Sequence, residues 1–439
     1  MIRALVRATA VVVAGAGCGS LGGDRPPNVL VVTLDTTRVD VVGAYGDPAA
    51  PSVTPVLDRL ATDAIRFDRA YTVTPLTIPA HSSLFTGLLP PRHGVRDNGD
   101  ARLSDAATTL AERLSAAGYQ TMASVGAEVT SRHWGFAQGF DVFRDPAPGP
   151  GNPTAVDRWR VERPADQVVD DAIRWLAAAD PERPWFVWVH LYDAHAPYAP
   201  PPAYRSLDPY RGEVAFADAQ LGRLLAAVRA SGEAGEADDG DPATAADDDA
   251  DRGGLDRTWV TVLADHGESL GEHGEAAHGV LVYDVTTRIP WIVRPPGGVP
   301  ARSIDAPVSG VDLTPTLLGA LGLPAGDVDG FDLSSAITGD WTPDSDRGVY
   351  VESRYAYVHY GWAVQRAWVD GRSTLIDSTV RRLFDRSDVP QRRDLAPSEP
   401  DRAAALAAAL DAYAATLVSP SGGPTLAPAA VSAAPEDRT

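Results

Sequence analysis

A hydroxyl and an imidazole lie one helical turn apart in the segment Thr77 to Gly87, which reads Thr-Ile-Pro-Ala-His-Ser-Ser-Leu-Phe-Thr-Gly. Pro79 fits the first turn of a helix, because its missing N–H would be unpaired there anyway, and Gly87 fits the C-terminal stop. The segment therefore predicts a short helix that begins just after Thr77. Because a helix N-terminus favours negative charge, Thr77 and His81 together suit attack on an anionic ester. The plainer alternative is an ordinary capped helix with a solvated histidine.

Further polar side chains follow long apolar runs that predict buried parallel strands. These runs are residues 28–34, 185–191 and 258–264. Asp35 follows the first run, His195 comes shortly after the second, and Asp265 and His266 follow the third, with His278 in the same loop. Because open α/β sheets bind ligands at the carboxyl ends of their strands, we expect these side chains to lie close together.

Asp35, Asp265 and His266, together with Thr77, form a mixed set of oxygen and nitrogen donors. Such a set suits Zn²⁺ or Mn²⁺ better than Ca²⁺, which prefers oxygen donors alone and is the alternative. A bound divalent ion would lower the pKa of the Thr77 hydroxyl and neutralise charge on an anionic substrate. A lone Asp after a strand usually caps a helix, so the prediction of a metal-dependent hydrolytic site rests on the family that these segments resemble.

The segment at Thr77 resembles the Cys-x-Pro-x-Arg motif of the sulfatases, a branch of the alkaline phosphatase superfamily, but reads Thr-x-Pro-x-His. Asp35-Thr36 stands where sulfatases carry two adjacent Asp, and Asp265-His266 stands where metal-binding members carry Asp-His or Asp-Asn. The motifs follow the same order as in the family. The resemblance implies an α/β fold with a mostly parallel central sheet flanked by helices and a small C-terminal antiparallel subdomain.

The resemblance also implies a role for each matching residue. Thr77 would be the nucleophile, His81 in the motif's Arg position would stabilise the oxyanion, and His195 would protonate the leaving oxygen. His278 takes the place of a family Lys and would steady the transferring group. The implied metal ligands are Asp35, Thr36, Thr77, Asp265 and His266. A Lys and a His that many sulfatases carry just past the strand 122–125 are absent here.

The substrate implied is a small-molecule, glycan or lipid ester of sulfate or phosphate. Sulfatases oxidise Cys or Ser to formylglycine, and a threonine cannot form that aldehyde. A phosphate bound to Thr77 can be released by attack of water at phosphorus, so the chemistry favours phosphoryl or phosphonyl esters, as in phosphodiesterases and in phosphoglycerol or phosphoethanolamine transferases. Two alternatives remain open, a transferase that uses an alcohol acceptor and an inactive binding protein with the same fold.

The composition limits the partners of the chain. A net charge of −21 argues against binding to nucleic acid or to an anionic membrane surface. The 439 residues contain no lysine, so a lysine cannot serve at the site. An anionic substrate must therefore be attracted by a local positive centre such as a metal ion. The sequence does not predict an oligomeric state.

The N-terminal residues predict export. Arg3 and Arg7 precede an apolar run, residues 8–16, that is too short to span a membrane, and the single cysteine, Cys18, follows. This pattern resembles a bacterial lipoprotein signal, in which the chain is anchored to a cell-envelope membrane only through lipid on the cysteine. The alternative is a conventional signal peptide and a secreted or periplasmic protein.

The remaining pattern gives an expected domain organisation. It comprises a signal peptide (1–18), a tether (19–27), a catalytic domain (28–335) with an acidic disordered insertion (231–256), a small C-terminal subdomain (345–417) and a disordered tail (418–439). We expect helices at 54–64, 103–117, 166–179, 212–230 and 403–417, and a strand at 67–73. Asp193 is expected to orient His195 or to bind a second metal ion, and His190 is expected to be a core residue.

Overall fold

The computed structural model describes residues 25–46, 51–99, 101–146, 161–231, 253–339, 341, 343–344 and 347–417. The predicted signal peptide with Cys18, nearly all of the acidic insertion and the tail lie outside these residues. Within the described ranges, no helix has the length and apolar character needed to cross a membrane.

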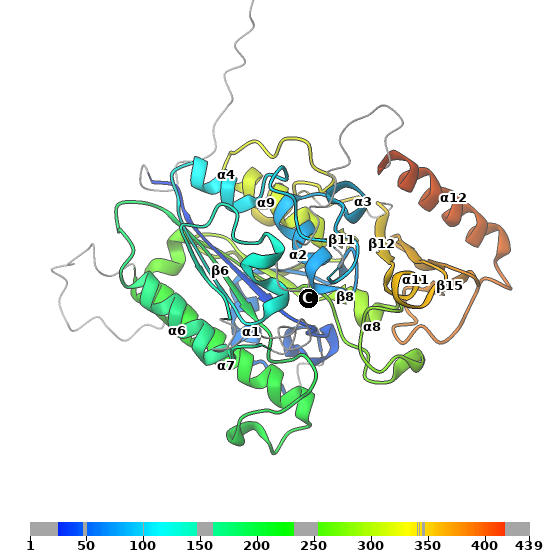
Figure 1. The fold of residues 1–439 in the computed structure, drawn as a ribbon, viewed down its shortest axis with the longest axis horizontal. Helices are drawn as coiled ribbons and strands as arrows, with labels where there is room; N and C mark the ends of the chain where they lie inside the picture. Colours follow the sequence, from blue (N-terminus) through cyan, green and yellow to red (C-terminus); the bar gives the residue numbers. More distant parts are fainter. Residues whose placement is uncertain are drawn as a thin grey trace, which may run out of the picture.

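An eight-stranded sheet forms the centre of the described structure, with strand order β10-β2-β9-β7-β1-β6-β4-β5 (Figure 1). The strands are β1 (Asn28–Leu34), β2 (Ile65–Phe67), β4 (Gln120–Val125), β5 (Val142–Arg144), β6 (Trp185–Leu191), β7 (Thr258–Ala264), β9 (Trp291–Arg294) and β10 (Arg302–Ile304). The pairings of β1 with β6 and β7, of β4 with β5 and β6, and of β10 with β2 are parallel. Strand β9 runs antiparallel to both of its neighbours. This is the mostly parallel sheet that the apolar runs predict.

Helices cover both faces of the sheet, which explains why its central strands are apolar throughout. Val29 and Val31 of β1 face a core shared with the helices on one side, and Leu30 and Val32 face a core shared with the helices on the other. On the first side lie α2 (Thr77–Thr86), α4 (Leu110–Ala116) and α9 (Leu313–Ala320), and on the second α1 (Pro55–Leu60), α6 (Ala165–Leu176) and α7 (Pro209–Ala230) (Figure 1). Each such fully buried aliphatic side chain stabilises the folded state by about 1.5–3 kcal/mol relative to leaving it exposed to water.

Two predicted elements are wrong in extent. The predicted strand 67–73 is divided, because β2 ends at Phe67 and β3 (Ala70–Tyr71) belongs to a separate three-stranded sheet with β8 (Arg288–Ile289) and β11 (Val308–Ser309). The predicted helix 103–117 begins only at Leu110. Thr109 stops it from extending further, because its hydroxyl accepts from the backbone of Glu112 while the Glu112 carboxylate accepts from the backbone of Thr109.

The C-terminal part forms the small antiparallel sheet that the resemblance implies. Its strands are β12 (Val349–Ser353), β13 (Gln365–Val369), β14 (Ser373–Asp377) and β15 (Arg382–Asp385), and α12 (Pro400–Leu417) packs against them. Figure 1 shows these elements on one side of the central sheet. The remaining α-helices in the described part of the chain are α3 (Pro90–His93), α8 (Asp284–Thr287), α10 (Ser334–Thr338) and α11 (Tyr355–Tyr360).

Candidate active site

The three central strands end at the same level, and this register creates the site. Leu34, the last residue of β1, pairs with Leu191 of β6 on one side and with Ala264 of β7 on the other. The next residues along β1 and β7 are Asp35 and Asp265, so the two carboxylates are brought together by strand pairing alone. The convergence that the sequence predicts is therefore present.

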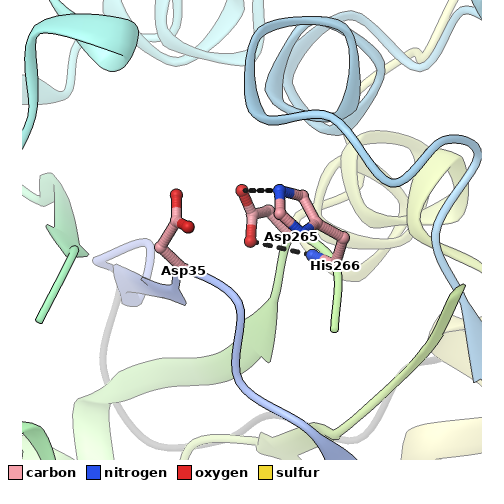
Figure 2. Close-up of side chains that lie close together, drawn as sticks. All are labelled: Asp35, Asp265 and His266. Carbon is pink, nitrogen blue, oxygen red and sulfur yellow. Dashed lines mark hydrogen bonds and ion pairs between the residues drawn. The ribbon is translucent and has the colours of Figure 1, made fainter. Parts of the chain in front are cut away.

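Asp35, Asp265 and His266 offer ligand atoms that all lie within 4.8 Å of one another, and all three side chains are buried (Figure 2). Burial raises the pKa of the Asp35 carboxyl well above its usual range, and the Asp265 carboxylate adds to the rise. Burial alone would also raise the pKa of Asp265, but the imidazoles of His266, His81 and His190 hold it below its usual value. Asp35 Oδ1 and Asp265 Oδ2 are buried without a hydrogen-bond partner. Paired buried carboxylates with unsatisfied oxygens fit a divalent cation.

Gly267 allows the loop after β7 to bring His266 into this position. A Cβ at Gly267 would lie 2.2 Å from the carbonyl oxygen of Val285, so only glycine fits this close approach of two backbones. His266 Nδ1 lies 2.9 Å from the carbonyl oxygen of Gly267. Because a carbonyl only accepts, Nδ1 carries the ring proton, and Nε2 presents its lone pair toward the site.

Helix α2 begins at Thr77, one residue earlier than predicted, because Leu76 occupies the N-cap. The Thr77 hydroxyl oxygen lies 3.2 Å from His266 Nε2 and 3.5 Å from Asp35 Oδ2. Gly87 ends the helix in the left-handed region, at φ 72°, as the sequence predicts. The candidate nucleophile therefore stands at a helix N-terminus and beside two candidate metal ligands.

Asn98 holds the N-terminus of α2, since its side-chain oxygen accepts from the backbone N–H of Ile78 at 3.0 Å. We expect Asn98→Ala to lower the free energy of unfolding by about 1 kcal/mol and to reduce kcat, because the turn that carries Thr77 loses its cap. Thr109→Ala at the start of α4 is the matched control, with a similar loss of stability and unchanged kcat. Equal effects of both variants on kcat would contradict a positioning role for Asn98.

His81 occupies a different position from the one that its predicted role requires. Its Nδ1 lies 2.9 Å from the carbonyl oxygen of Thr77 and 3.6 Å from Asp265 Oδ2, and its Nε2 lies 3.1 Å from the hydroxyl of Thr33. The ring is completely buried. With both nitrogens engaged, His81 has no N–H to offer a substrate oxyanion. The structure gives it a positioning role instead, because it supports the turn that carries Thr77 and the Asp265 carboxylate.

Thr36 ties the loops at the strand ends together. Its hydroxyl donates to the carbonyl oxygen of Ala194 at 2.7 Å, and its backbone N–H donates to Asp265 Oδ1 at 3.3 Å. Its φ of 49° is strained for a β-branched residue, and such strain is concentrated at functional sites. Coordination of a metal ion by Thr36 stays a prediction.

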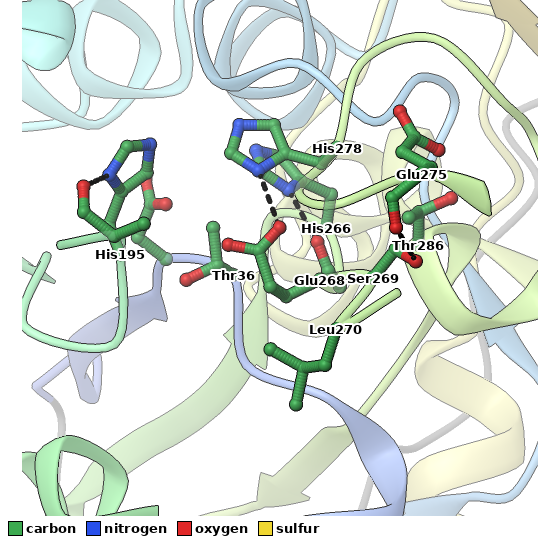
Figure 3. Close-up of polar contacts among 12 residues, drawn as sticks. Thr36, His195, His266, Glu268, Ser269, Leu270, Glu275, His278 and Thr286 are labelled. Atoms are coloured by element: carbon green, nitrogen blue, oxygen red, sulfur yellow. Dashed lines mark hydrogen bonds and ion pairs between the residues drawn. The ribbon is translucent and has the colours of Figure 1, made fainter. Parts of the chain in front are cut away.

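His278 lies beside both His266 and His195, and Figure 3 shows these three side chains together with Glu268. The His278 ring lies 5.2 Å from that of His195 and 4.4 Å from that of His266 between centroids. Nδ1 of His195 lies 2.7 Å from the carbonyl oxygen of Ala196, and Nδ1 of His278 lies 3.0 Å from Glu268 Oε1. Burial lowers the pKa of each to about 4, and His278 contributes to the shift of His195. Both rings are therefore neutral near pH 7 until an anion approaches.

Asp193 does not orient His195. Its Oδ1 accepts from the backbone N–H of Ala165 at 3.0 Å, so it caps helix α6, and the tautomer of His195 is fixed by Ala196 instead. Asp193 Oδ2 is buried without a hydrogen-bond partner, and a role for Asp193 in a second metal site stays a prediction.

The role of Asp193 predicts a pH dependence of stability. Burial raises the pKa of Asp193 to about 7, whereas the unfolded value is about 4. Between these values the folded protein holds a proton that the unfolded chain releases, so this contribution to stability is full below about pH 4 and is lost as pH rises through about 7. The urea midpoint of the unaltered protein should therefore fall between pH 5 and pH 8. Asp193→Asn keeps the acceptor oxygen but cannot titrate, so we expect a smaller fall in this variant. An unchanged fall would contradict this assignment.

Two residues of the site were not predicted from the sequence. His190, interpreted as a core residue, is indeed completely buried, but its Nε2 lies 3.5 Å from Asp35 Oδ2. Glu268 links the site to its surroundings, because it accepts from the Tyr198 hydroxyl at 3.0 Å and contacts His278. For His190, the sequence feature that could have indicated a place in the site is its position, because it is the last residue but one of a strand that ends there.

The comparison with protein families agrees with this geometry. The sulfatase family model matches residues 27–237 and 248–323. The chain belongs to the sulfatase family. An uncharacterized sulfatase, YidJ of Escherichia coli, is 29% identical over 423 residues, covering 83% of this chain and 82% of the relative. Human arylsulfatase A is 27% identical over 394 residues, covering 74% of this chain and 73% of the relative.

Solved structures confirm the fold of this sulfatase-family chain. The putative sulfatase yidJ from Bacteroides fragilis superposes with a TM-score of 0.72 at 20% identity, covering 92% of this chain and 98% of that structure. Phosphonate monoester hydrolase of Agrobacterium radiobacter superposes with a TM-score of 0.68 at 21% identity, covering 89% and 95%. The protein is thus an ester hydrolase of the alkaline phosphatase superfamily, from a metal-dependent family.

Proposed function

We propose that this protein is a metal-dependent hydrolase of anionic esters in which Thr77 replaces formylglycine as the nucleophile. The observation that carries the proposal is the position of the Thr77 hydroxyl, 3.2 Å from His266 Nε2 and 3.5 Å from Asp35 Oδ2 at the first turn of α2. A purely structural role in the helix would not explain why the Thr77 hydroxyl lies beside two buried candidate metal ligands.

The residues that fit the cation are Asp35, Asp265 and His266. Bound there, Zn²⁺ or Mn²⁺ would favour ionisation of the Thr77 hydroxyl and offset negative charge on the substrate. The nitrogen donor favours these ions over Ca²⁺, for which the protein offers carboxylates but no complete oxygen shell among the described ligand residues.

The chain's own residues account for the remaining steps. Thr77 Oγ attacks the phosphorus or sulfur atom, and the bond to the ester oxygen breaks on the opposite side. His195 protonates the leaving oxygen, because an approaching anion raises its pKa from the low value of the free site. His278 contacts the transferring group and is supported in its charged form by Glu268. Water then releases the acid from Thr77.

The nucleophile favours phosphate or phosphonate esters over sulfate esters. Formylglycine releases sulfate by eliminating it from a hydrated carbonyl, and a threonine ester has no such route. A phosphoryl or phosphonyl group on Thr77 is open to attack by water at phosphorus. We therefore propose phosphodiesters and phosphonate monoesters as the preferred substrate class, with the organic part of the ester left to further screening.

The test is hydrolysis of matched chromogenic esters by the chain starting after residue 18. Nitrophenyl sulfate, a nitrophenyl phosphodiester and a nitrophenyl phosphonate would be compared with Zn²⁺, Mn²⁺ or Ca²⁺ added to the metal-free protein. Turnover of the phosphorus esters with Zn²⁺ or Mn²⁺ is the expected result. Preferred turnover of the sulfate would overturn the substrate class. Absence of turnover together with absence of bound metal would identify an inactive binding protein instead.

A further inference from the structure

The completely buried His190 ring has one nitrogen with no hydrogen-bond partner, and this atom points into the candidate metal site. His190 Nε2 is buried without a partner and lies 3.5 Å from Asp35 Oδ2. The unsatisfied oxygens Asp35 Oδ1 and Asp265 Oδ2 belong to the same site. An orphaned imidazole nitrogen in a protein interior costs free energy unless another group uses its lone pair.

The hydroxyl of Thr33 decides which nitrogen of His190 carries the proton. Thr33 Oγ1 lies 3.0 Å from His190 Nδ1, 3.1 Å from His81 Nε2 and 3.0 Å from Trp188 Nε1. A hydroxyl donates one hydrogen bond and accepts two. Trp188 can only donate, so it fills one acceptor position of Thr33, and the two histidines must share the other acceptor position and the single proton.

His81 takes the proton of Thr33, because its own proton is used elsewhere. His81 Nδ1 faces the carbonyl oxygen of Thr77 at 2.9 Å, and a carbonyl can only accept, so Nδ1 carries the ring proton. With the ring proton on Nδ1, His81 Nε2 carries a lone pair and accepts from the Thr33 hydroxyl at 3.1 Å. The remaining partner, His190 Nδ1, must then donate to Thr33, and this leaves His190 Nε2 with a free lone pair.

We propose that His190 Nε2 is an additional metal ligand from β6, so that the ion is held by two histidines and two aspartates with the Thr77 hydroxyl alongside. This inference rests on the proposed metal centre and extends it. Ligands about 2.1 Å from one ion lie roughly 3.0–3.5 Å apart. His190 Nε2 lies 3.5 Å from Asp35 Oδ2, which fits this spacing, although His190 is not among the residues, Asp35, Asp265 and His266, whose ligand atoms all lie within 4.8 Å of one another. His266 Nε2 to Asp265 Oδ2 and Thr77 Oγ1 to His266 Nε2 measure 3.5 and 3.2 Å.

The additional ligand changes the choice of metal ion. Two imidazoles from separate strands make the site richer in nitrogen, which strengthens binding of Zn²⁺ and other transition metals relative to Ca²⁺ and Mg²⁺. The ligand role of His190 also explains why a histidine occupies position 81 of the motif. The imidazole of His81 completes the hydrogen bonds that orient His190 through the Thr33 hydroxyl.

The test uses Co²⁺ as the bound ion and proton NMR in water. Paramagnetic Co²⁺ strongly shifts the ring N–H signal of each histidine that coordinates it through the other nitrogen. Both rings keep such a proton in a protected hydrogen bond, to the Gly267 carbonyl for His266 and to Thr33 for His190. We expect two shifted exchangeable signals in the unaltered protein and one in His190→Gln.

A binding measurement on the same variants gives a second readout that needs no turnover. His190→Gln is expected to weaken Zn²⁺ binding at least roughly tenfold while changing Ca²⁺ binding less than about threefold. His93→Gln is the matched control, because His93 is equally buried but contacts Ser83 away from the site. This control is expected to keep both signals and full Zn²⁺ affinity.

A single shifted signal in the unaltered protein would overturn the proposal, even if the protein hydrolyses esters, and the proposed function would then stand without it. Two signals and unchanged Zn²⁺ affinity in His190→Gln would overturn it as well. Failure of the unaltered protein to bind Co²⁺ or Zn²⁺ would remove the metal centre and this inference together. The signal count in the unaltered protein makes the test independent of whether any variant folds.

Discussion

Thr77→Ala is expected to reduce kcat by roughly 1,000-fold or more on the preferred ester, because the variant has no atom to accept the transferred group. The substitution removes a hydroxyl and a methyl group from the first turn of a helix, so stability should change little. Thr77→Ser keeps the hydroxyl and is expected to retain measurable turnover. The measurement is steady-state hydrolysis of the chromogenic esters with saturating Zn²⁺, followed by mass spectrometry of the quenched protein for a modified Thr77 peptide.

The matched control for this substitution is Thr86→Ala in the same helix. Thr86 is also buried, but its hydroxyl donates to the carbonyl oxygen of Ser82 in the last turn and does not face the site. We expect this variant to keep kcat within a few-fold of the unaltered protein. A Thr77→Ala variant that retained more than a tenth of the activity would show that another group, such as an activated water, attacks the ester.

Asp35→Asn is expected to have opposite effects on metal binding and on the stability of the metal-free protein. Loss of one buried carboxylate should weaken Zn²⁺ binding by about 100-fold or more. Without metal, the same change removes the repulsion between the Asp35 and Asp265 carboxylates. Burial and this repulsion are the causes of the raised pKa of Asp35. At pH 8 the metal-free variant should therefore be more stable than the metal-free unaltered protein, by on the order of 1 kcal/mol.

Calorimetric titration with Zn²⁺ and urea unfolding with and without chelator measure these two effects. Zn²⁺ should reverse the order of stability, because an ion that binds only the folded protein stabilises it according to its affinity. Asp218→Asn is the matched control, since Asp218 is buried but accepts from the backbone of Val56 and Leu57 at the start of α1. An Asp35→Asn protein that bound Zn²⁺ normally would exclude Asp35 from the metal site.

Much of the fold could be predicted because the central strands are buried on both faces. The expected bounds of β1, β6 and β7 agree with the structure, since a continuous apolar run needs no knowledge of its neighbours to be recognised. The predicted helix 103–117 is wrong in its start, because the apolar residues before Leu110 pack without helical backbone and the capping box at Thr109 fixes the first turn. Local hydrogen bonding thus overrode the periodicity.

The site could be predicted where it depends on strand ends and not where it depends on side-chain direction. Asp35, Asp265 and His266 converge as expected because strand register fixes their backbones, and the first turn of α2 brings the Thr77 hydroxyl beside them. The oxyanion role of His81 failed, because the partners of its two ring nitrogens are set by tertiary contacts that spacing does not reveal. The prediction that His190 is a core residue is confirmed by its complete burial, but burial alone does not distinguish a packing histidine from a ligand.

Apart from the adjacent Asp265 and His266, the groups of this site are far apart along the chain. The bond from Thr36 to Asp265 spans 229 positions, and that from Thr77 to His266 spans 189. A growing or unfolded chain therefore offers a metal ion only the adjacent Asp265 and His266, so the complete set of ligands forms only after the long-range strand pairs have formed. The metals present where folding is completed, together with the affinity of the ligands, then decide which ion the protein carries.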